Sequence, residues 1–320
     1  MRKLEVTAES WPIAGSFTIA RGSKTKADVV VVSLTENGFT GRGEAVPYGR
    51  YNETVPQCVA ALEQMGDTIG SVNKLSLPKA AQNALDCAMW DLEAKSKGKP
   101  AWQLANLNQP IATITAYTLS LDTPEAMAKA AAGAAHYPLL KLKLGRAGDV
   151  ERLAAIRSAV PKARLIVDAN EGWLPEILPS MLEACEKHRV ELVEQPLPAG
   201  NDEALHNMPR KTIICADESA HDIEGLHLLK GKYDAINIKL DKTGGLTAAL
   251  ALAQAAQKQD FKIMVGCMLA TSLAMAPAFL LAQLADYVDL DGPLLLANDR
   301  KPGIVYNNGI MSPPPSALWG

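Results

Sequence analysis

The segment from residue 139 to residue 170 reads LLKLKLGRAGDVERLAAIRSAVPKARLIVDAN, and it displays the unit from which the fold is built. A short apolar run comes first (139–145), a stretch rich in Ala, Leu and charged residues follows, and a second apolar run (163–170) completes the unit. This order predicts a strand, a helix and a second strand, which is the unit of parallel β-sheets.

Six further runs of the same kind occur in the second part of the chain: TITAYTLS (113–120), VELVEQP (190–196), TIICADES (212–219), AINIKL (235–240), KIMVG (262–266) and YVDLDG (287–292). Marker residues near the carboxyl ends of successive runs are 22 to 27 residues apart. This is the length of one strand, one helix and two short loops, and eight such units close into a parallel barrel with helices outside. An open doubly wound sheet would usually carry a Gly-rich turn after its first strand, and none is found there.

Residues 1–108 have a different character, which predicts a small α+β domain. The strand-like run 28–35 ends in Glu-Asn-Gly and indicates a hairpin. Apolar residues three and four apart predict a helix over 78–97, which Gly98 stops. We expect the barrel to occupy 109–298 and a tail, 299–320, to pack back onto the first domain, with a short strand at 303–306.

The composition points to a compact protein that acts on small molecules. The chain of 320 residues has 32 Lys and Arg against 35 Asp and Glu, a net charge of −3, so nucleic acid and membrane partners are not expected. Five cysteines without a C-x-x-C pair, together with a start that lacks a secretory pattern, predict a cytoplasmic protein. The uncharged stretch 263–285 is interpreted as a buried strand and helix. The sequence leaves open whether the chain forms a homo-oligomer.

The chemistry is expected at the carboxyl ends of the barrel strands. Because side chains alternate along a strand, Lys141 and Lys143 face one way while the leucines around them face the helices. Asp168, Glu194 and Asp217 end three consecutive strands and are predicted to converge on one point. Each alone could be a helix cap or a solvated residue, but three in phase need a cation, and oxygen ligands favour Mg²⁺.

Lys143 and Lys239 are the predicted acid–base pair. Each is flanked by aliphatic residues in a buried strand, and their strands lie on opposite sides of an eight-strand barrel. Beside a divalent cation we expect the pKa of such a lysine to fall from about 10.4 toward roughly 7 to 8, the range suited to a general base. Two opposed bases could remove a proton and return one from the other face. Lys242 competes with Lys239, but its position predicts a loop.

Five motifs carry a family resemblance: KLK at 141–143, DAN at 168–170, EQP at 194–196, DES at 217–219 and NIKLDKTGG at 237–245. In this order and spacing they resemble the muconate-lactonizing subgroup of the enolase superfamily. DLDG at 289–292 and ARG at 20–22 make the chain most similar to the dipeptide epimerases of that subgroup, those that act on L-Ala-D/L-Glu.

The resemblance implies an α/β protein, a (β/α)7β modified TIM barrel with an N-terminal α+β capping domain. It also implies site residues: Mg²⁺ on Asp168, Glu194 and Asp217, catalysis by Lys143 and Lys239, and substrate contacts from Arg21, Thr118, Lys141, Asp289 and Asp291. Among the contacts, Lys141 would meet the substrate carboxylate, the two aspartates its ammonium group, and Arg21 the carboxylate of its Glu side chain. For Arg21 a solvated loop charge is the alternative.

The implied function is Mg²⁺-dependent epimerisation of the Glu stereocentre of L-Ala-D/L-Glu dipeptides in murein peptide metabolism. The reaction would be a two-base 1,1-proton transfer through a metal-stabilised enediolate. Three alternatives remain: an N-acylamino-acid racemase, an o-succinylbenzoate synthase on the same site, and a non-catalytic ligand-binding barrel. Residues 47–52 are a further hypothesis, a mobile lid over the substrate.

Overall fold

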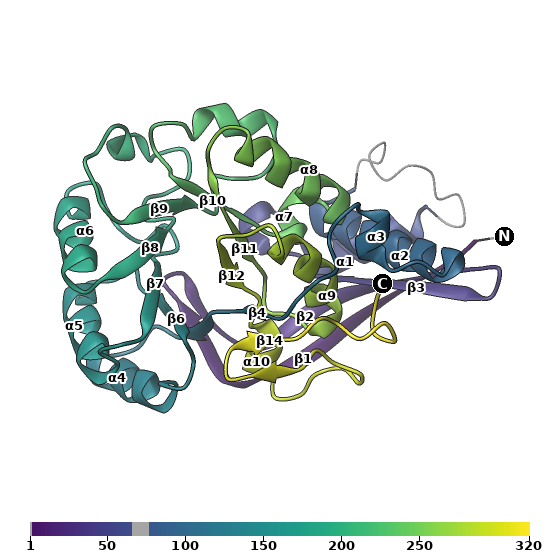
Figure 1. Cartoon of the computed structure of the whole chain (residues 1–320), viewed down its shortest axis with the longest axis horizontal. Helices are drawn as coiled ribbons and strands as arrows, with labels where there is room; N and C mark the ends of the chain where they lie inside the picture. The colour runs from purple at the N-terminus through teal and green to yellow at the C-terminus, as the bar shows by residue number, and fades with distance from the viewer. Residues whose placement is uncertain (1, 66–76) are drawn as a thin grey trace.

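The structure is a computed structural model that describes residues 2–65 and 77–320, with a barrel at one end and a sheet domain at the other (Figure 1). The elements of the sheet domain are β1 (Lys3–Ile19), β2 (Gly22–Glu36), β3 (Phe39–Ala45), η1 (Gly49–Tyr51), α1 (Val55–Glu63), α2 (Lys79–Lys97) and α3 (Ala101–Leu104). The three strands form an antiparallel sheet in the order β1-β2-β3, and the predicted hairpin is confirmed.

Helix α2 packs its apolar face on this sheet. Leu85 and Leu92 are buried there with Val30 and Val32 of β2, as the helical spacing predicts. The helix ends at Lys97, where Gly98 adopts φ 59° and its N–H bonds to the last carbonyl groups, so the predicted stop is confirmed. The antiparallel sheet and its covering helix thus form the α+β domain expected for the first part of the chain.

Eight parallel strands form the barrel: β5 (Tyr117–Leu119), β6 (Leu139–Lys143), β7 (Arg164–Asp168), β8 (Val190–Glu194), β9 (Ile213–Ala216), β10 (Ala235–Ile238), β11 (Lys262–Gly266) and β12 (Tyr287–Asp289). Neighbours in sequence are neighbours in space. The first and last strands meet where Ala116 N donates to Val288 O at 2.8 Å, so the ring is nearly closed. The predicted barrel is confirmed.

The connections are less regular than the sequence pattern predicts. Most strands are followed by α-helices: α4 (Pro124–Gly133), α5 (Asp149–Ala159), α6 (Leu178–Lys187), α7 (Leu240–Thr243), α8 (Leu246–Gln257), α9 (Ser272–Ala282) and α10 (Gly292–Leu295). After β8 and β9 only the 3₁₀ turns η3 (Glu203–Leu205) and η4 (Glu224–Leu228) occur. The expectation of a helical stretch after every run is therefore wrong at these two positions, whose loops hold prolines, glycines and aspartates.

The tail contains a small hairpin of β13 (Tyr306–Asn307) and β14 (Ile310–Met311), which pairs with β4 (Thr113–Ile114). The predicted strand at 303–306 is wrong except for its last residue. The hairpin instead forms around Asn308 and Gly309, both with positive φ, which is the two-residue turn that Asn-Gly favours.

The chain end lies against the sheet domain. Trp319 Nε1 donates to Cys87 O at 2.9 Å, and Gly320 N donates to Asp91 Oδ1 at 2.6 Å. These contacts support the division that we propose, a first domain at 1–108, the barrel at 109–298 and a returning tail at 299–320. The uncharged stretch 263–285 forms β11 and α9, and among the described residues no helix is long and apolar enough to cross a membrane.

Candidate active site

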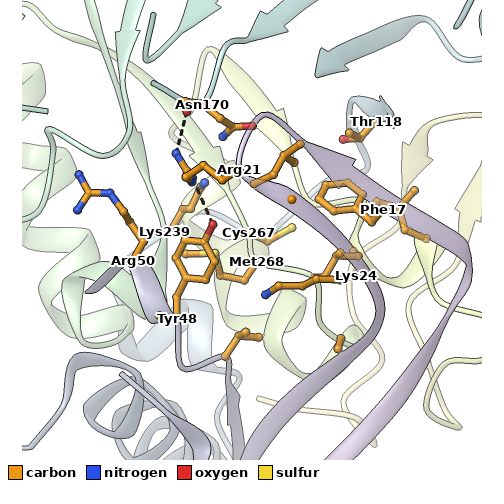
Figure 2. A pocket seen from close by; sticks show the side chains of 18 of the residues that line it. Phe17, Arg21, Lys24, Tyr48, Arg50, Thr118, Asn170, Lys239, Cys267 and Met268 are labelled. Carbon is orange, nitrogen blue, oxygen red and sulfur yellow. Dashed lines mark hydrogen bonds between the residues drawn. The ribbon is translucent and has the colours of Figure 1, made fainter. Parts of the chain in front are cut away.

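The inside of the barrel is layered, with an apolar floor and a charged top. Leu139, Ile166, Leu192, Cys215, Ala235 and Met264 form the floor with Ala116. One inward step further along the same strands stand the charged residues of the predicted site. They open onto a cavity of about 820 Å³ between the barrel and the first domain (Figure 2). The alternation along each strand explains this layering, because inward-facing residues are two apart.

Lys141 and Lys143 both point inward from β6, as predicted, while Leu142 and Leu144 pack in the outer core. Lys141 Nζ lies 2.6 Å from Asp289 and 2.7 Å from Glu194, and the side chain is completely buried. Lys143 Nζ lies 2.6 Å from Asp168 Oδ2 and also lines the cavity. The two lysines therefore connect β6 with three other strands of the barrel.

Asp217, which follows β9, is held by two lysines that follow the neighbouring strand β10. Lys239 Nζ lies 2.7 Å from one carboxylate oxygen, and Lys242 Nζ lies 2.6 Å from the other. The prediction that Lys242 belongs to a loop is wrong, since it stands in the short helix α7. Its ammonium group is enclosed, with backbone acceptors on Asp217 and Asn237 as well, whereas Lys239 lines the cavity. Only Lys239 can reach a substrate.

The three acids Asp168, Glu194 and Asp217 follow adjacent strands, but they do not meet at one point. In the described part of the chain, no three His, Cys, Asp or Glu side chains form a group that could hold a metal ion as they stand. Lys141 lies between Asp168 and Glu194, at 3.4 and 2.7 Å, and Lys239 lies between Glu194 and Asp217, at 3.8 and 2.7 Å. The predicted convergence is thus corrected: buried anions separate when ammonium groups can enter between them.

The donor chemistry still fits a hard divalent cation. All three carboxylates are buried, and Asp217 also lines the cavity. Asp168 and Glu194 occupy paired positions at the ends of the neighbouring strands β7 and β8. Their charges act on one another, because burial and the repulsion from Asp168 raise the pKa of Glu194. Asn237 Nδ2 fixes Glu194 Oε1 at 2.7 Å, and the absence of a side chain on Gly266 makes room for Asn237, which a Cβ there would meet at 2.6 Å.

The expected depression of the pKa does not appear at Lys239. Burial lowers the pKa of Lys239, but the attraction of Asp217 and Glu194 outweighs burial and holds the pKa well above its ordinary value. The pKa of Lys141 is raised in the same way, by Asp289 and Glu194 against burial. The expectation assumed that a cation would face the lysines, and in this structure carboxylates face them.

Arg21 occupies the junction of the two domains. Its guanidinium lies 2.7 Å from Glu218 and 3.0 Å from Glu171, and it donates to Asn170 O and Tyr48 Oη (Figure 2). It lines the cavity, so a freely solvated loop charge is ruled out, but two carboxylates already accept from it. A substrate carboxylate would therefore have to compete with Glu218 and Glu171 for the Arg21 guanidinium.

Lys24 is the cation that the sequence reasoning missed. It follows Arg21 by three residues and points into the cavity, with Nζ 5.1 Å from the centre of the Tyr48 ring (Figure 2). Among the described residues it has no carboxylate partner, unlike the other Lys and Arg side chains that line the cavity. The sequence signal was its place three residues after Arg21, near the start of the long strand β2, and only the folded contacts of Arg21 make this place significant.

Thr118, Asp289 and Asp291 come together across the closing strands of the barrel. Asp291 Oδ2 accepts from Thr118 N at 2.6 Å, and all three residues line the cavity. Burial and the nearby charge of Asp289 raise the pKa of Asp291 to about 7. Of these two aspartates, only Asp289 pairs with Lys141, so Asp291 has no ion pair among the described residues.

Two more residues of the cavity wall were not predicted as site residues. Glu218, the neighbour of Asp217, is almost fully buried, and burial with the charge of Asp217 raises its pKa to about 7. Tyr51 belongs to the hypothesised lid at 47–52 and packs edge-on against His221. Arg50 of the same segment holds Glu171 with two hydrogen bonds of 2.9 and 2.8 Å. Whether this segment moves stays a prediction.

Comparison with known proteins gives two family matches that together span most of the chain. Residues 1–105 match the N-terminal domain of mandelate racemase and muconate lactonizing enzyme, and residues 125–317 match the enolase C-terminal domain-like family. An N-acetyl-D-glutamate racemase of Pseudoalteromonas is 46% identical over 91% of this chain and 95% of its own. An L-Ala-D/L-Glu epimerase of Escherichia coli K12 is 45% identical over 97% of this chain and 99% of its own.

Solved structures of known proteins are similar to this chain over nearly its whole length. An enolase family member from Agrobacterium tumefaciens with homology to dipeptide epimerases, with bound sodium and L-Ala-L-Glu and an ordered loop, superimposes with a TM-score of 0.98 at 49% identity over the whole of both chains. A dipeptide epimerase of Enterococcus faecalis, complexed with Mg and the dipeptide L-Leu-L-Tyr, has a TM-score of 0.91 at 30% identity, covering 99% of this chain and 98% of that one.

Replacement of Asp291 by Asn should stabilise the protein in a pH-dependent way. Because the pKa of Asp291 is about 7 in the folded chain, against an ordinary value of 3.8, its ionisation costs folding free energy as the pH rises from about 4 to 7. Asn keeps an acceptor for Thr118 N without the charge. We expect the stability gain of D291N to be larger at pH 8 than at pH 4.5 by about 2–4 kcal/mol.

Urea unfolding followed by Trp fluorescence at the two pH values measures this gain. D260N, which changes an exposed carboxylate, is the matched control and should show no such pH dependence. An equal effect of D291N at both pH values would show that the pKa of Asp291 is not raised in the folded protein.

Proposed function

The chain belongs to the mandelate racemase and muconate lactonizing enzyme family of the enolase superfamily, and from this premise we propose that it is a dipeptide epimerase acting on the Glu stereocentre of L-Ala-D/L-Glu. One observation carries the proposal. Lys143 and Lys239, from strands four places apart in an eight-strand barrel, both line the cavity, with the three buried acids on the strands between them. Groups so placed reach a bound substrate from opposite sides.

The two lysines act in turn on one carbon. A lysine that is neutral takes the proton next to the substrate carboxylate, and the opposite lysine, as an ammonium ion, gives a proton to the other face. The transferred protons balance, the stereocentre inverts, and the lysines exchange roles for the reverse direction. Asp168 accepts from Lys143 and Asp217 accepts from Lys239, so each ammonium group is held at the cavity wall.

Asp168, Glu194 and Asp217 are the residues that would hold Mg²⁺. The chemistry that bound Mg²⁺ supplies is charge stabilisation of the enediolate into which the substrate carboxylate is converted. The E. faecalis relative solved with Mg supports this choice of ion, and so do three buried carboxylates, because carboxylate oxygens are hard donors that suit Mg²⁺. Lys141, between two of these acids, is placed to attract the same substrate carboxylate.

The rest of the cavity suits a dipeptide with a free amino group. Asp289 and Asp291 present two carboxylates to the substrate ammonium group, and Thr118 lies beside them. For the side-chain carboxylate of Glu we propose Lys24 as the main partner instead of Arg21 alone. Lys24 is free to pair, whereas Arg21 would have to release Glu218 or Glu171. Arg21 then orders the turn that directly precedes β2, the strand that carries Lys24.

We propose a cytoplasmic location and a role in murein peptide metabolism. The five cysteines are all free, and four of them are buried, which suits a reducing compartment. L-Ala-L-Glu is bound in the A. tumefaciens relative, which supports a dipeptide of this composition as the substrate.

Loss of either central lysine should abolish epimerisation. Because each face of the carbon needs its own acid or base, K143A and K239A should each reduce kcat by about 10²–10⁴-fold or more. The measurement is ¹H NMR of L-Ala-L-Glu in D₂O with Mg²⁺, which follows the Glu α-proton and the formation of the other epimer. K258A, at an exposed position on the outside of the barrel, is the control. EDTA should stop the wild type and added Mg²⁺ restore it, but not the variants; full activity in either variant would refute the assignment.

Replacement of Lys24 should change specificity and not chemistry. We expect K24M to lower kcat/KM for L-Ala-L-Glu by about 10–100-fold, the value of a charged hydrogen bond. For L-Ala-L-Leu, which has no side-chain carboxylate, kcat/KM should stay unchanged or rise. Equal losses for both dipeptides would remove Lys24 from the side-chain subsite.

A second candidate function is racemisation of N-acyl glutamate, which the 46% identical N-acetyl-D-glutamate racemase favours. The two substrates differ at the nitrogen, where only the dipeptide carries an ammonium group. If the enzyme is a dipeptide epimerase, D291A should reduce turnover of L-Ala-L-Glu about tenfold or more and leave N-acetylglutamate unaffected. Faster turnover of N-acetylglutamate than of the dipeptide by the wild type would favour the second candidate.

A further inference from the structure

Gln195 joins the ends of the three strands that carry the acids. It follows Glu194 at the end of β8 and is completely buried. Its backbone N donates to Cys215 O of β9 at 2.8 Å, and its backbone O accepts from Glu171 N, just beyond β7, at 2.9 Å. Its φ of +34° lies in the left-handed region, where a residue other than Gly is strained unless its surroundings hold it.

The side chain of Gln195 supplies that hold. Oε1 accepts from Asp217 N at 2.9 Å and from Ser219 N at 3.1 Å, so a side chain from β8 fixes the backbone that carries Asp217. Nε2 faces three acceptors, Leu197 O at 2.8 Å, Tyr233 Oη at 2.9 Å and Ser219 Oγ at 3.0 Å. Both ends of the carboxamide are therefore engaged, and the side chain faces away from the cavity.

The carboxylate of Asp202 determines which way round the Gln195 carboxamide lies, through the hydroxyl groups of Tyr233 and Ser219. Asp202 Oδ2 lies 2.7 Å from Tyr233 Oη and 3.0 Å from Ser219 Oγ, and Lys232 Nζ lies 2.7 Å from Oδ1. Burial raises the pKa of Asp202, but these donors outweigh burial and lower it, so Asp202 is ionised at neutral pH. Both hydroxyl groups then donate to Asp202 and can only accept from Gln195, which leaves Oε1 for the N–H groups of Asp217 and Ser219.

We propose that Gln195 is a positioning residue that sets the affinity of Asp168, Glu194 and Asp217 for their divalent cation, with Asp202 and Tyr233 holding it in place. The proposal rests on the proposed function, because it takes these acids as the cation ligands. Gln195 touches the strand ends of all three and carries no charge itself. Its loss should therefore weaken cation binding by releasing the ligands, with no electrostatic change at the site.

Calorimetric titration of the full chain with Mg²⁺ alone, without substrate, tests this inference. Q195M keeps the side-chain length and removes its hydrogen bonds, and we expect the Kd for Mg²⁺ to rise about 10–100-fold. Y233F removes the hydroxyl that links Gln195 to Asp202 and should raise the Kd less, about threefold to tenfold. Y287F is the matched control, because Tyr287 begins β12 at the opposite end of the barrel, and its Kd should equal that of the wild type.

The outcomes separate the inference from the proposed function. If the wild type binds no Mg²⁺, the assignment of the cation site is wrong, and this inference is wrong with it. If the wild type binds Mg²⁺ and both variants bind it as tightly, Gln195 has only a structural role and the inference alone is overturned. A lower melting temperature with an unchanged Kd counts the same way. Should Q195M not fold, Y233F decides, because it removes a single oxygen atom.

Discussion

Asp217 lies between two buried ammonium groups, with Lys239 at 2.7 Å on one oxygen and Lys242 at 2.6 Å on the other, and the whole charged layer of the barrel continues this alternation. Lys141 is the converse case, an ammonium group between the carboxylates of Glu194 and Asp289. A single buried charge without a partner would cost several kcal/mol, so the charges of this layer stabilise one another in the barrel. The layer stands on an apolar floor, and alternation along the strands places its side chains inside the barrel.

The two domains contribute different residues to the cavity wall. The barrel supplies the lysines and acids, which its strands hold in fixed register, whereas Arg21, Lys24 and Arg50 come from the first domain. Arg21 and Arg50 pair with Glu171 of the barrel, and Arg21 also pairs with Glu218, so the domain junction is itself ionic. In the proposed function, proton transfer would therefore depend on the barrel strands. The choice of substrate side chain would depend on the β1–β2 turn, the start of β2 and a short 3₁₀ segment, which can vary without disturbing the barrel.

Local rules predicted much of this site, and their failures share a cause. Alternation along a strand placed Lys141 and Lys143 correctly, and regular spacing predicted all eight strands. The predicted loop position of Lys242 was wrong, because the chain turns into helix α7 directly after Lys239. The partners of Arg21 are 150 and 197 residues away, a pairing that no local pattern encodes. The raised pKa of Lys239 likewise follows from which carboxylates surround it, and that is a property of the closed ring.

Backbone strain is concentrated where the acids stand. Asn residues account for several of the positive φ angles, as expected of turns, but Glu171 at +66° and Gln195 at +34° are residues that rarely adopt this conformation. Each follows a predicted cation ligand by one to three positions, and each is held by contacts across strands: Glu171 by Arg21 and Arg50, Gln195 by its carboxamide. Strain of about 1–3 kcal/mol per residue persists only where the surroundings over-determine the conformation. The cross-strand contacts of Glu171 and Gln195 therefore fix the backbone directly after β7 and β8, next to the buried carboxylates of Asp168 and Glu194.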